Sequence, residues 1–438
     1  MNVESEIHTT NDDHLTLNGV DLVDLSGKYG TPLFVFDEKR FVDNYRRFHT
    51  AVEKYHSKNM VCYSIKTNYN LAVCKRMREE DSYAEVASGL DLHVAQQVGF
   101  PADHLVFDGL YKPEEVLREA VNYGVRLINA ESFSELNLIN KVAGQLGKKQ
   151  SVGIRVSTFA KKRFNPEDLY CNPLSRFGFS YEDAYEIFRK ASEFPNLDIN
   201  GLMTHPYWGI HTFLPFARRI QTELDRHIEY INFGGGYEKG SRKIGLQDLF
   251  KDMMRQKLGL ESDIDSVKAK PVRSIEEMAR RMVAEVGETI GKDHTLIFEP
   301  GRYLIHDAGI LLVKAGVVKS SAGFKWVVVD GGTNLISDYL ERRDIVVANH
   351  ANSPPEEIVN VVGPLLFARD FVTIKKKLPR IAEGDVLAVF NSGAYTLSSS
   401  TQFLNPRPAA VLINGNGEIT EARRRESYDY ILQMDERS

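Results

Sequence analysis

Short apolar runs alternate with amphipathic stretches through residues 38–305, and this rhythm predicts parallel strands joined by helices. Eight apolar runs qualify as strands, and each but the last is followed by helical sequence. Eight parallel strands with crossover helices close into a (β/α)8 barrel, whereas an open doubly wound sheet, the alternative, needs no such count. The expected strands are residues 61–66, 83–88, 105–109, 126–130, 152–157, 201–205, 230–234 and 296–301, and the helices include 41–54, 113–123, 132–143, 181–193 and 274–290.

After residue 305 the rhythm changes to short β-rich runs separated by Gly-, Asn- and Asp-containing turns, a pattern typical of an all-β domain. We expect the N-terminal segment, which contains the apolar run Leu33–Asp37, to pack with that domain. The predicted organisation is therefore an N-terminal segment at 1–37, a barrel at 38–305 and a C-terminal β domain at 306–438. Residues 239–273 interrupt the last barrel repeat as a long excursion, and the expected β-domain strands are 309–313, 326–329, 345–347, 386–390 and 409–412.

Composition narrows the class of protein. The chain has 438 residues and a formal net charge of -5, which gives no signal for binding nucleic acid. No apolar run approaches the length that spans a bilayer, and the acidic, polar start at Met1–Glu6 differs from a secretory signal. Its three cysteines are odd in number and lack metal-ligand spacing, so we predict a reduced, cytoplasmic protein without a bound metal.

Candidate chemistry gathers where the expected strands end, which is where the active sites of such barrels lie. The apolar run Val61–Ile65 ends in Lys66, which is either a solvated rim residue or a nucleophile, because a partly desolvated amine can attack a carbonyl. An amine, an imidazole, a carboxylate and a glycine loop converge there, in outline a cofactor site. The strand-end residues are Lys66, Ser88, Asn129, Arg155, His205, Gly234, Gly235, Gly236, Glu299 and Arg302.

Each of these residues also has a structural interpretation. Three consecutive glycines form either a flexible turn or a nest of backbone N–H groups for an anion. His205 is either a satisfied core histidine or a ring that stacks on a flat cofactor. Glu299 either pairs with Arg302 or faces a ring nitrogen and keeps it protonated while Arg302 reaches a phosphate. Tyr395, in the β domain, has no role on position alone.

Taken together, these segments resemble the fold-type III pyridoxal-phosphate (PLP) decarboxylases, the family that contains diaminopimelate and ornithine decarboxylases. The resemblance runs over nearly the whole chain, from Thr31 to Pro408. Each motif is short, but their order along the chain is specific. The motifs are Tyr63-Ser64-Ile65-Lys66-Thr67-Asn68, Ser88-Gly89-Leu90-Asp91, Ser175-Arg176-Phe177-Gly178, Gly234-Gly235-Gly236, Glu299-Pro300-Gly301-Arg302, Val361-Val362-Gly363-Pro364 and Ser392-Gly393-Ala394-Tyr395.

The resemblance implies PLP as cofactor, a decarboxylase reaction on an amino acid, and three catalytic residues. Lys66 would hold PLP covalently, His205 would stack on the pyridine ring, and Glu299 would pair with the ring nitrogen. It also implies a head-to-tail homodimer in which the partner's segments equivalent to 330–332 and 363–364 complete each site. The phosphate ligands would be Gly234, Gly235, Gly236, Arg302 and Tyr395, and Glu85, Ser88 and Arg155 complete the expected cofactor-binding set.

The chain departs from this family on the substrate side. Diaminopimelate decarboxylases carry a Cys-Glu pair shortly after the Gly-Pro, where this chain has Leu366 and Phe367, and the arginine expected after Asp-Gly-Gly is missing. Losing these charges removes the groups that grip the distal end of diaminopimelate. We therefore expect a substrate other than diaminopimelate, namely an unusual or derivatised L-amino acid that can also be tethered to a carrier protein. Such substrates are typical of the antibiotic or siderophore branch of this family. The expected substrate pocket contains Tyr207, Trp208, His211, Leu366 and Phe367.

Several alternatives stay open at this point. Without the usual cysteine, the proton donor to Cα would be His211, Tyr207 or Cys171. A racemase or another Cα-chemistry enzyme on the same scaffold is the main alternative function. Glu299 argues against a racemase, which an arginine at the ring nitrogen would favour. A PLP-free regulatory homologue is a further alternative, against which the intact Lys66 weighs. A metal hydrolase is remote, because no His/Asp pair has ligand spacing.

Overall fold

The computed structural model describes residues 7–10, 12–157, 176–238, 246–258, 260, 272–336, 341 and 343–436. The chain divides into two compact units. The barrel unit contains Asn44–Tyr237 and Arg273–Gly301, and the β unit contains Met1–Asp43, Glu238–Val272 and Arg302–Ser438.

Eight parallel strands of the barrel unit close on themselves in the order β10-β11-β12-β5-β6-β7-β8-β9, which confirms the predicted barrel. The strand sequences are apolar because most positions are buried on both faces, as in β8, where all four residues are buried. Met60, Cys62, Val106, Leu127 and Ile297 fill one layer of the interior. The strands are β5 (Asn59–Ser64), β6 (Tyr83–Val86), β7 (Leu105–Phe107), β8 (Leu127–Ala130), β9 (Gln150–Val156), β10 (Leu197–Thr204), β11 (Tyr230–Asn232) and β12 (Thr295–Phe298).

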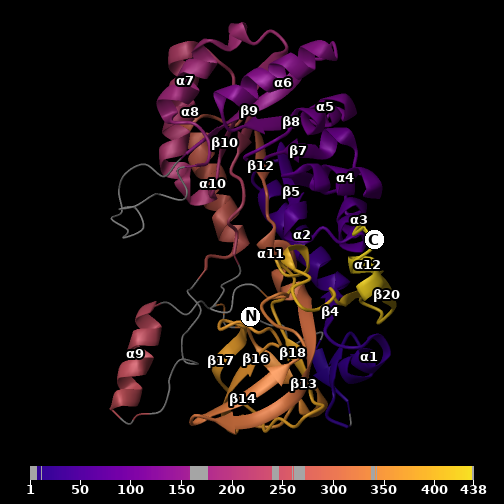
Figure 1. The fold of residues 1–438 in the computed structure, drawn as a ribbon. Coiled ribbons are helices and arrows are strands. Elements are labelled where there is room, and N and C mark those ends of the chain that lie inside the picture. Colours follow the sequence, from indigo (N-terminus) through magenta and orange to yellow (C-terminus); the bar gives the residue numbers. More distant parts are fainter. Residues whose placement is uncertain are drawn as a thin grey trace. The chain divides into compact units, whose positions relative to one another are not determined.

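Amphipathic helices surround these strands (Figure 1), and α4, α6, α7 and α10 begin at a serine cap. Ser88, Ser132, Ser180 and Ser274 each accept a backbone N–H of the first turn, as N-cap serines do. None of the helices in the described ranges is long and apolar enough to cross a membrane. The barrel helices are α2 (Glu38–Glu53), which begins in the β unit, α3 (Leu71–Glu79), α4 (Gly89–Val98), α5 (Glu114–Tyr123), α6 (Phe133–Gln145), α7 (Tyr181–Arg189), α8 (Ile210–Leu224) and α10 (Ile275–Thr289).

The β unit joins the two ends of the chain in one sheet. Strand β4 (Leu33–Asp37) pairs antiparallel with β13 (Gly309–Ser321) and parallel with β19 (Ala409–Ile413), so the N-terminal segment does enter the C-terminal β domain. The excursion after the glycine triplet contributes helix α9 (Leu246–Lys257), anchored by an ion pair between Asp252 and Lys375. The other elements are β1 (Ile7–Thr9), β2 (Leu15–Leu17), β3 (Val20–Asp21), α1 (Leu22–Tyr29), α11 (Arg302–Ile305), β14 (Phe324–Val329), β15 (Ile345–Val347), β16 (Glu357–Val362), β17 (Phe371–Leu378), β18 (Val386–Val389), β20 (Ile419–Arg423) and α12 (Tyr428–Ile431).

Candidate active site

Lys66 lies on a 3₁₀ turn, Ile65–Thr67, directly after β5, and its amine pairs with a buried carboxylate. Lys66 Nζ is 2.5 Å from Glu85 Oε2, and Ser64 Oγ donates to the same carboxylate. The Glu85 side chain has no exposed area, whereas 44% of the Lys66 side chain is exposed. The buried carboxylate therefore positions an amine that still reaches solvent and so is accessible to a ligand.

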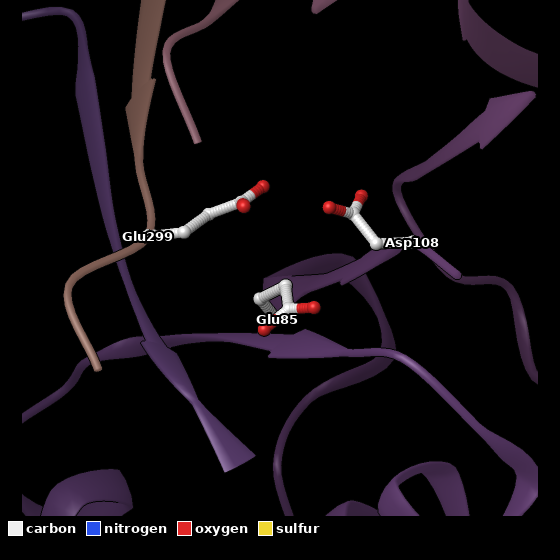
Figure 2. Close-up of side chains that lie close together, drawn as sticks. All are labelled: Glu85, Asp108 and Glu299. Atoms are coloured by element: carbon white, nitrogen blue, oxygen red, sulfur yellow. The ribbon is translucent and has the colours of Figure 1, made fainter. Parts of the chain in front are cut away.

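Three carboxylates meet beneath this amine. Oxygen atoms of Glu85, Asp108 and Glu299 all lie within 4.8 Å of one another, and the three residues are buried (Figure 2). Glu85 and Glu299 were predicted from the sequence, whereas Asp108 was not. The sequence did indicate Asp108, because it directly follows the apolar run Leu105–Phe107, just as the other candidate residues directly follow their strands.

Burial and mutual repulsion raise the pKa values of two of these carboxyls. Burial comes first for Glu299, followed by the charges of Asp108 and Glu85, and together they raise its pKa well above the usual range. Burial and then the charge of Glu85 raise the pKa of Asp108 to about 6. Each accepts one side-chain amide: Asn232 Nδ2 donates to Glu299 at 2.6 Å, and Asn129 Nδ2 donates to Asp108 at 2.6 Å. The cluster therefore favours a proton or a cation.

His205 and the glycine triplet form one packed corner of the site. Gly234 has φ +60°, and a Cβ there would lie 2.6 Å from His205 Nδ1, so this turn requires glycine. The Gly235 N–H donates to His205 Nδ1 at 2.9 Å, and the Gly234 N–H donates to Asn232 Oδ1 at 2.8 Å. Two of the three backbone donors are thus used within the protein, which leaves the Gly236 N–H as the triplet's remaining donor toward an anion.

The His205 imidazole is kept neutral. Burial is the main cause, and the nearby charges of Arg155 and Lys66 add to it, so that the pKa falls to about 4. A neutral ring fits stacking against a flat cofactor better than a cation would in this corner, which already contains two cationic side chains.

This shift predicts a pH dependence of stability. A histidine whose pKa is lower in the folded state than in the unfolded state binds fewer protons when folded, so its contribution is lost as pH falls from about 6.5 to about 4. In urea unfolding of the cofactor-free chain, His205→Gln should reduce the loss of unfolding free energy over this range by at most about 3 kcal/mol. Equal pH slopes for the variant and the wild type would contradict the assignment.

Two other predicted cofactor ligands are already engaged within the barrel unit. Arg155 Nη1 lies 2.5 Å from Glu131 Oε1, and the Arg155 guanidinium lies over the ring of Phe177. Ser88 Oγ accepts the N–H of Asp91 as the cap of α4. Both residues stand at strand ends as expected, and their roles toward a cofactor stay predictions.

The predicted substrate-side residues of the barrel unit follow β10. Tyr207 stacks on Tyr237 with ring centroids 4.7 Å apart, and Trp208 lies against Gly236. His211 instead lies in the first turn of α8. Its side chain is 79% exposed and bonds through Nδ1 to Glu285 at 2.7 Å. The geometry thus groups the two aromatic residues with the glycine triplet and places His211 on the surface, while Cys171 lies outside the described residues.

The remaining candidates belong to the β unit. The Arg302 guanidinium lies over the ring of Tyr395 at 5.3 Å, and Arg302 Nη1 donates to Glu341 at 3.4 Å. Burial alone would raise the pKa of Glu341, but a hydrogen bond from His306 and nearby arginines lower it to about 2. Arg302 and Tyr395 therefore form a joint cationic and aromatic corner, and their role as ligands of one anion stays a prediction.

The barrel-unit residues fit PLP, whose aldehyde, ring nitrogen and phosphate need different partners. The Lys66 amine is accessible to an aldehyde, the buried Glu299 favours a protonated ring nitrogen, and the neutral His205 ring can cover a flat face. The close-packed glycine turn admits a ligand against its backbone. The chemistry of these groups matches a cofactor that is covalently held and protonated at its ring.

Comparison with known proteins agrees with this assignment. The family model described as "Pyridoxal-dependent decarboxylase, pyridoxal binding domain" matches residues 39–306. A diaminopimelate decarboxylase of Methanothermobacter thermautotrophicus is 30% identical over 98% of this chain and 97% of its own, and one of Aquifex aeolicus is 29% identical over 96% of each. The crystal structure of the M. jannaschii diaminopimelate decarboxylase superposes with a TM-score of 0.84, covering 99% of this chain and 98% of that one at 26% identity.

The fold and the site define a PLP-dependent enzyme on a (β/α)8 barrel. The chain belongs to the pyridoxal-dependent decarboxylase family. The predicted cofactor, the decarboxylase class and an amino acid as substrate are confirmed.

The expectation of a substrate other than diaminopimelate was wrong. Full-length relatives at 27–30% identity are named diaminopimelate decarboxylases, and the preference for an antibiotic or siderophore branch has no support. Leu366 and Phe367 were expected in an apolar distal pocket. Within a single chain they are 91% and 50% exposed, so this chain alone does not enclose them.

Proposed function

We propose that this protein removes one carboxylate from diaminopimelate and thereby produces L-lysine. The observation that carries the proposal is the full-length similarity to diaminopimelate decarboxylases, which leaves no large region of either chain unmatched. A related enzyme, from M. jannaschii, is described in complex with L-lysine, the compound that diaminopimelate becomes when it loses carbon dioxide from one end. Free diaminopimelate needs no carrier protein, so the proposed substrate is not a carrier-protein-tethered amino acid.

The residues of the barrel unit would each have a different role toward the cofactor. When bound, PLP supplies the electron sink for the electron pair that remains as carbon dioxide leaves. Lys66 is the residue that would hold the cofactor and release it to the incoming amino group. Glu299 would keep a proton at the ring nitrogen, and His205 would cover a ring face without adding charge. Glu85 would take up the Lys66 amine when that amine is free.

A substrate series tests this proposal. The PLP-loaded protein should show a kcat/KM for meso-diaminopimelate at least about 100-fold above those for lysine, ornithine and arginine, because a site built for a distal amino-acid group rejects molecules that lack its carboxylate. Product should be identified as lysine by mass spectrometry, with Lys66→Ala as the blank. A preference for lysine or ornithine would contradict the proposed substrate.

We further infer a head-to-tail homodimer. Its expected contributing segments, 330–332 and 363–364, are held together in the β unit by Asp370, which accepts the N–H groups of Thr333 and Leu365 at 2.7 Å each. Leu366 and Phe367 emerge beside this junction, and a partner subunit would cover them. The buried free thiols of Cys62 and Cys74 support the cytoplasmic location that the composition predicts.

The dimer gives a prediction for Leu366→Asp. Placing a charge at this exposed apolar position should shift the molar mass measured by light scattering from that of two chains toward that of one. Leu432→Asp, at a half-exposed position of the same unit near the C-terminus, is the control and should leave the mass unchanged. A Leu366→Asp protein that remains dimeric at low micromolar concentration would contradict this interface.

A further inference from the structure

Asp108 is held at the mouth of the barrel by its own backbone. Its N–H donates to Val86 O on the neighbouring strand at 2.8 Å. The next residue, Gly109, has φ +111°, and a Cβ there would lie 2.5 Å from Ala87 O, so only glycine permits this close approach. The Asp108 carboxylate, 5% exposed, is therefore fixed toward Glu85 and Glu299 (Figure 2).

The charges around Asp108 are unevenly distributed. Lys66 follows β5 and pairs with Glu85 of β6, while Arg155 of β9 pairs with Glu131. Each cation near the cluster thus has a carboxylate of its own. Within the described ranges, the side-chain donors to Asp108 and Glu299 are the amides of Asn129 and Asn232, respectively.

Two carboxylates so placed cannot both stay ionised without cost. Water is largely excluded, and amide donors supply a partial charge rather than a full one. The Asp108 charge is the strongest single charge that acts on Glu299, ahead of that of Glu85. Burial and this repulsion raise the pKa of both carboxyls, and the neighbouring Asp108 charge favours a proton on Glu299.

We propose that Asp108 is a positioning residue whose ionised carboxylate holds a proton on Glu299 and, once PLP is bound, on the ring nitrogen that Glu299 is expected to face. Asp108 acts through Glu299 and takes no part in bond making or breaking. The charge of Asp108 increases the proton affinity of Glu299 and of the ring nitrogen. The backbone around Asp108 keeps that charge in a fixed position. The inference deepens the proposed function, on which its kinetic readout rests.

The test uses PLP labelled with ¹⁵N in the ring, bound to wild type, Asp108→Asn, Asp108→Glu and Asp103→Asn. Asp108→Asn removes the charge and keeps an oxygen that can accept from Asn129. Asp103, exposed and just before β7, is the matched control at the other end of the same strand. The ¹⁵N chemical shift reports ring protonation without any substrate, so a failure of the proposed substrate would leave this readout intact.

Between pH 7 and 8, the wild type and Asp103→Asn should show a protonated ring nitrogen. Asp108→Asn should move the ¹⁵N shift toward that of neutral pyridine, and Asp108→Glu should retain the protonated value. With diaminopimelate, kcat of Asp108→Asn should fall about 10- to 100-fold, the effect of one charge at this distance, while KM changes by less than about threefold. Should Asp108→Asn fail to fold, Asp108→Ser provides the same neutral change with a smaller side chain.

Two outcomes overturn the proposal. An unchanged ¹⁵N shift in the neutral variants would show that Asp108 does not control the ring nitrogen. Millimolar Mg²⁺ or Ca²⁺ that raises the Tm of the cofactor-free wild type, but not of Asp108→Asn, would instead make the three carboxylates a cation site.

Discussion

Lys66→Ala is expected to lose decarboxylase activity by at least about 10⁴-fold, because no other residue of the described strand ends offers an accessible amine to hold the cofactor. The variant should also lose covalently bound PLP, which gel filtration and the visible absorption of the protein fraction would reveal. The buried Glu85 carboxylate would also lose its ion-pair partner, so the Tm of the variant should be lower than that of the wild type.

Lys58→Ala is the matched control for this experiment. Lys58 precedes the same strand at its other end, is 62% exposed and pairs with Asp293 on the surface, so its loss should leave kcat and bound PLP unchanged. Lys66→Ala that retains substantial activity would contradict the assigned role. A regulatory protein would retain partner binding in this variant, whereas the enzyme described here loses its chemistry.

Glu299→Gln should lower kcat about 10²- to 10³-fold with little change in KM. Glutamine keeps the acceptor for Asn232 but cannot hold a proton shared with a ring nitrogen, and so weakens the electron sink. The variant loses stabilisation of the transition state, in which negative charge develops, and not of the bound substrate, so kcat changes more than KM. Steady-state kinetics with diaminopimelate would measure it.

Glu288→Gln is the corresponding control, since Glu288 is exposed near the end of α10 and touches no part of the carboxylate cluster. Glu299→Asp keeps the charge but shortens the side chain, and should fall between the wild type and Glu299→Gln. If kcat of Glu299→Gln stayed within about threefold of the wild type, the ring-nitrogen role of Glu299 would be wrong.

The sequence predicted the barrel well because its strands are buried on both faces and so appear as unbroken apolar runs. The β unit was harder to predict. β16 (Glu357–Val362) and β17 (Phe371–Leu378) were not recognised, since polar residues and three consecutive lysines interrupt their apolar pattern. The association of α9 with the β unit rests on the pair Asp252–Lys375, a contact between distant residues that no local pattern indicates.

The strand-end rule selected Lys66, His205 and Glu299, and the structure places them around one site. Asp108 satisfied the same rule and was overlooked. Asn232 was also missed, because an amide does not titrate and draws no attention in a search for charged groups. The substrate prediction failed for a different reason. Missing charges at two sequence positions do not reveal which charges converge in space, and Leu366 turned out to be exposed.

The proposed reaction breaks the bond between Cα and a carboxylate of diaminopimelate. It is tested by mass spectrometry of the products that the PLP-loaded protein forms in heavy water. The expected product is lysine, lighter than the substrate by carbon dioxide and carrying one carbon-bound deuterium at the decarboxylated carbon. Deuterium exchange into diaminopimelate without loss of mass as carbon dioxide would contradict the claim and indicate a racemase.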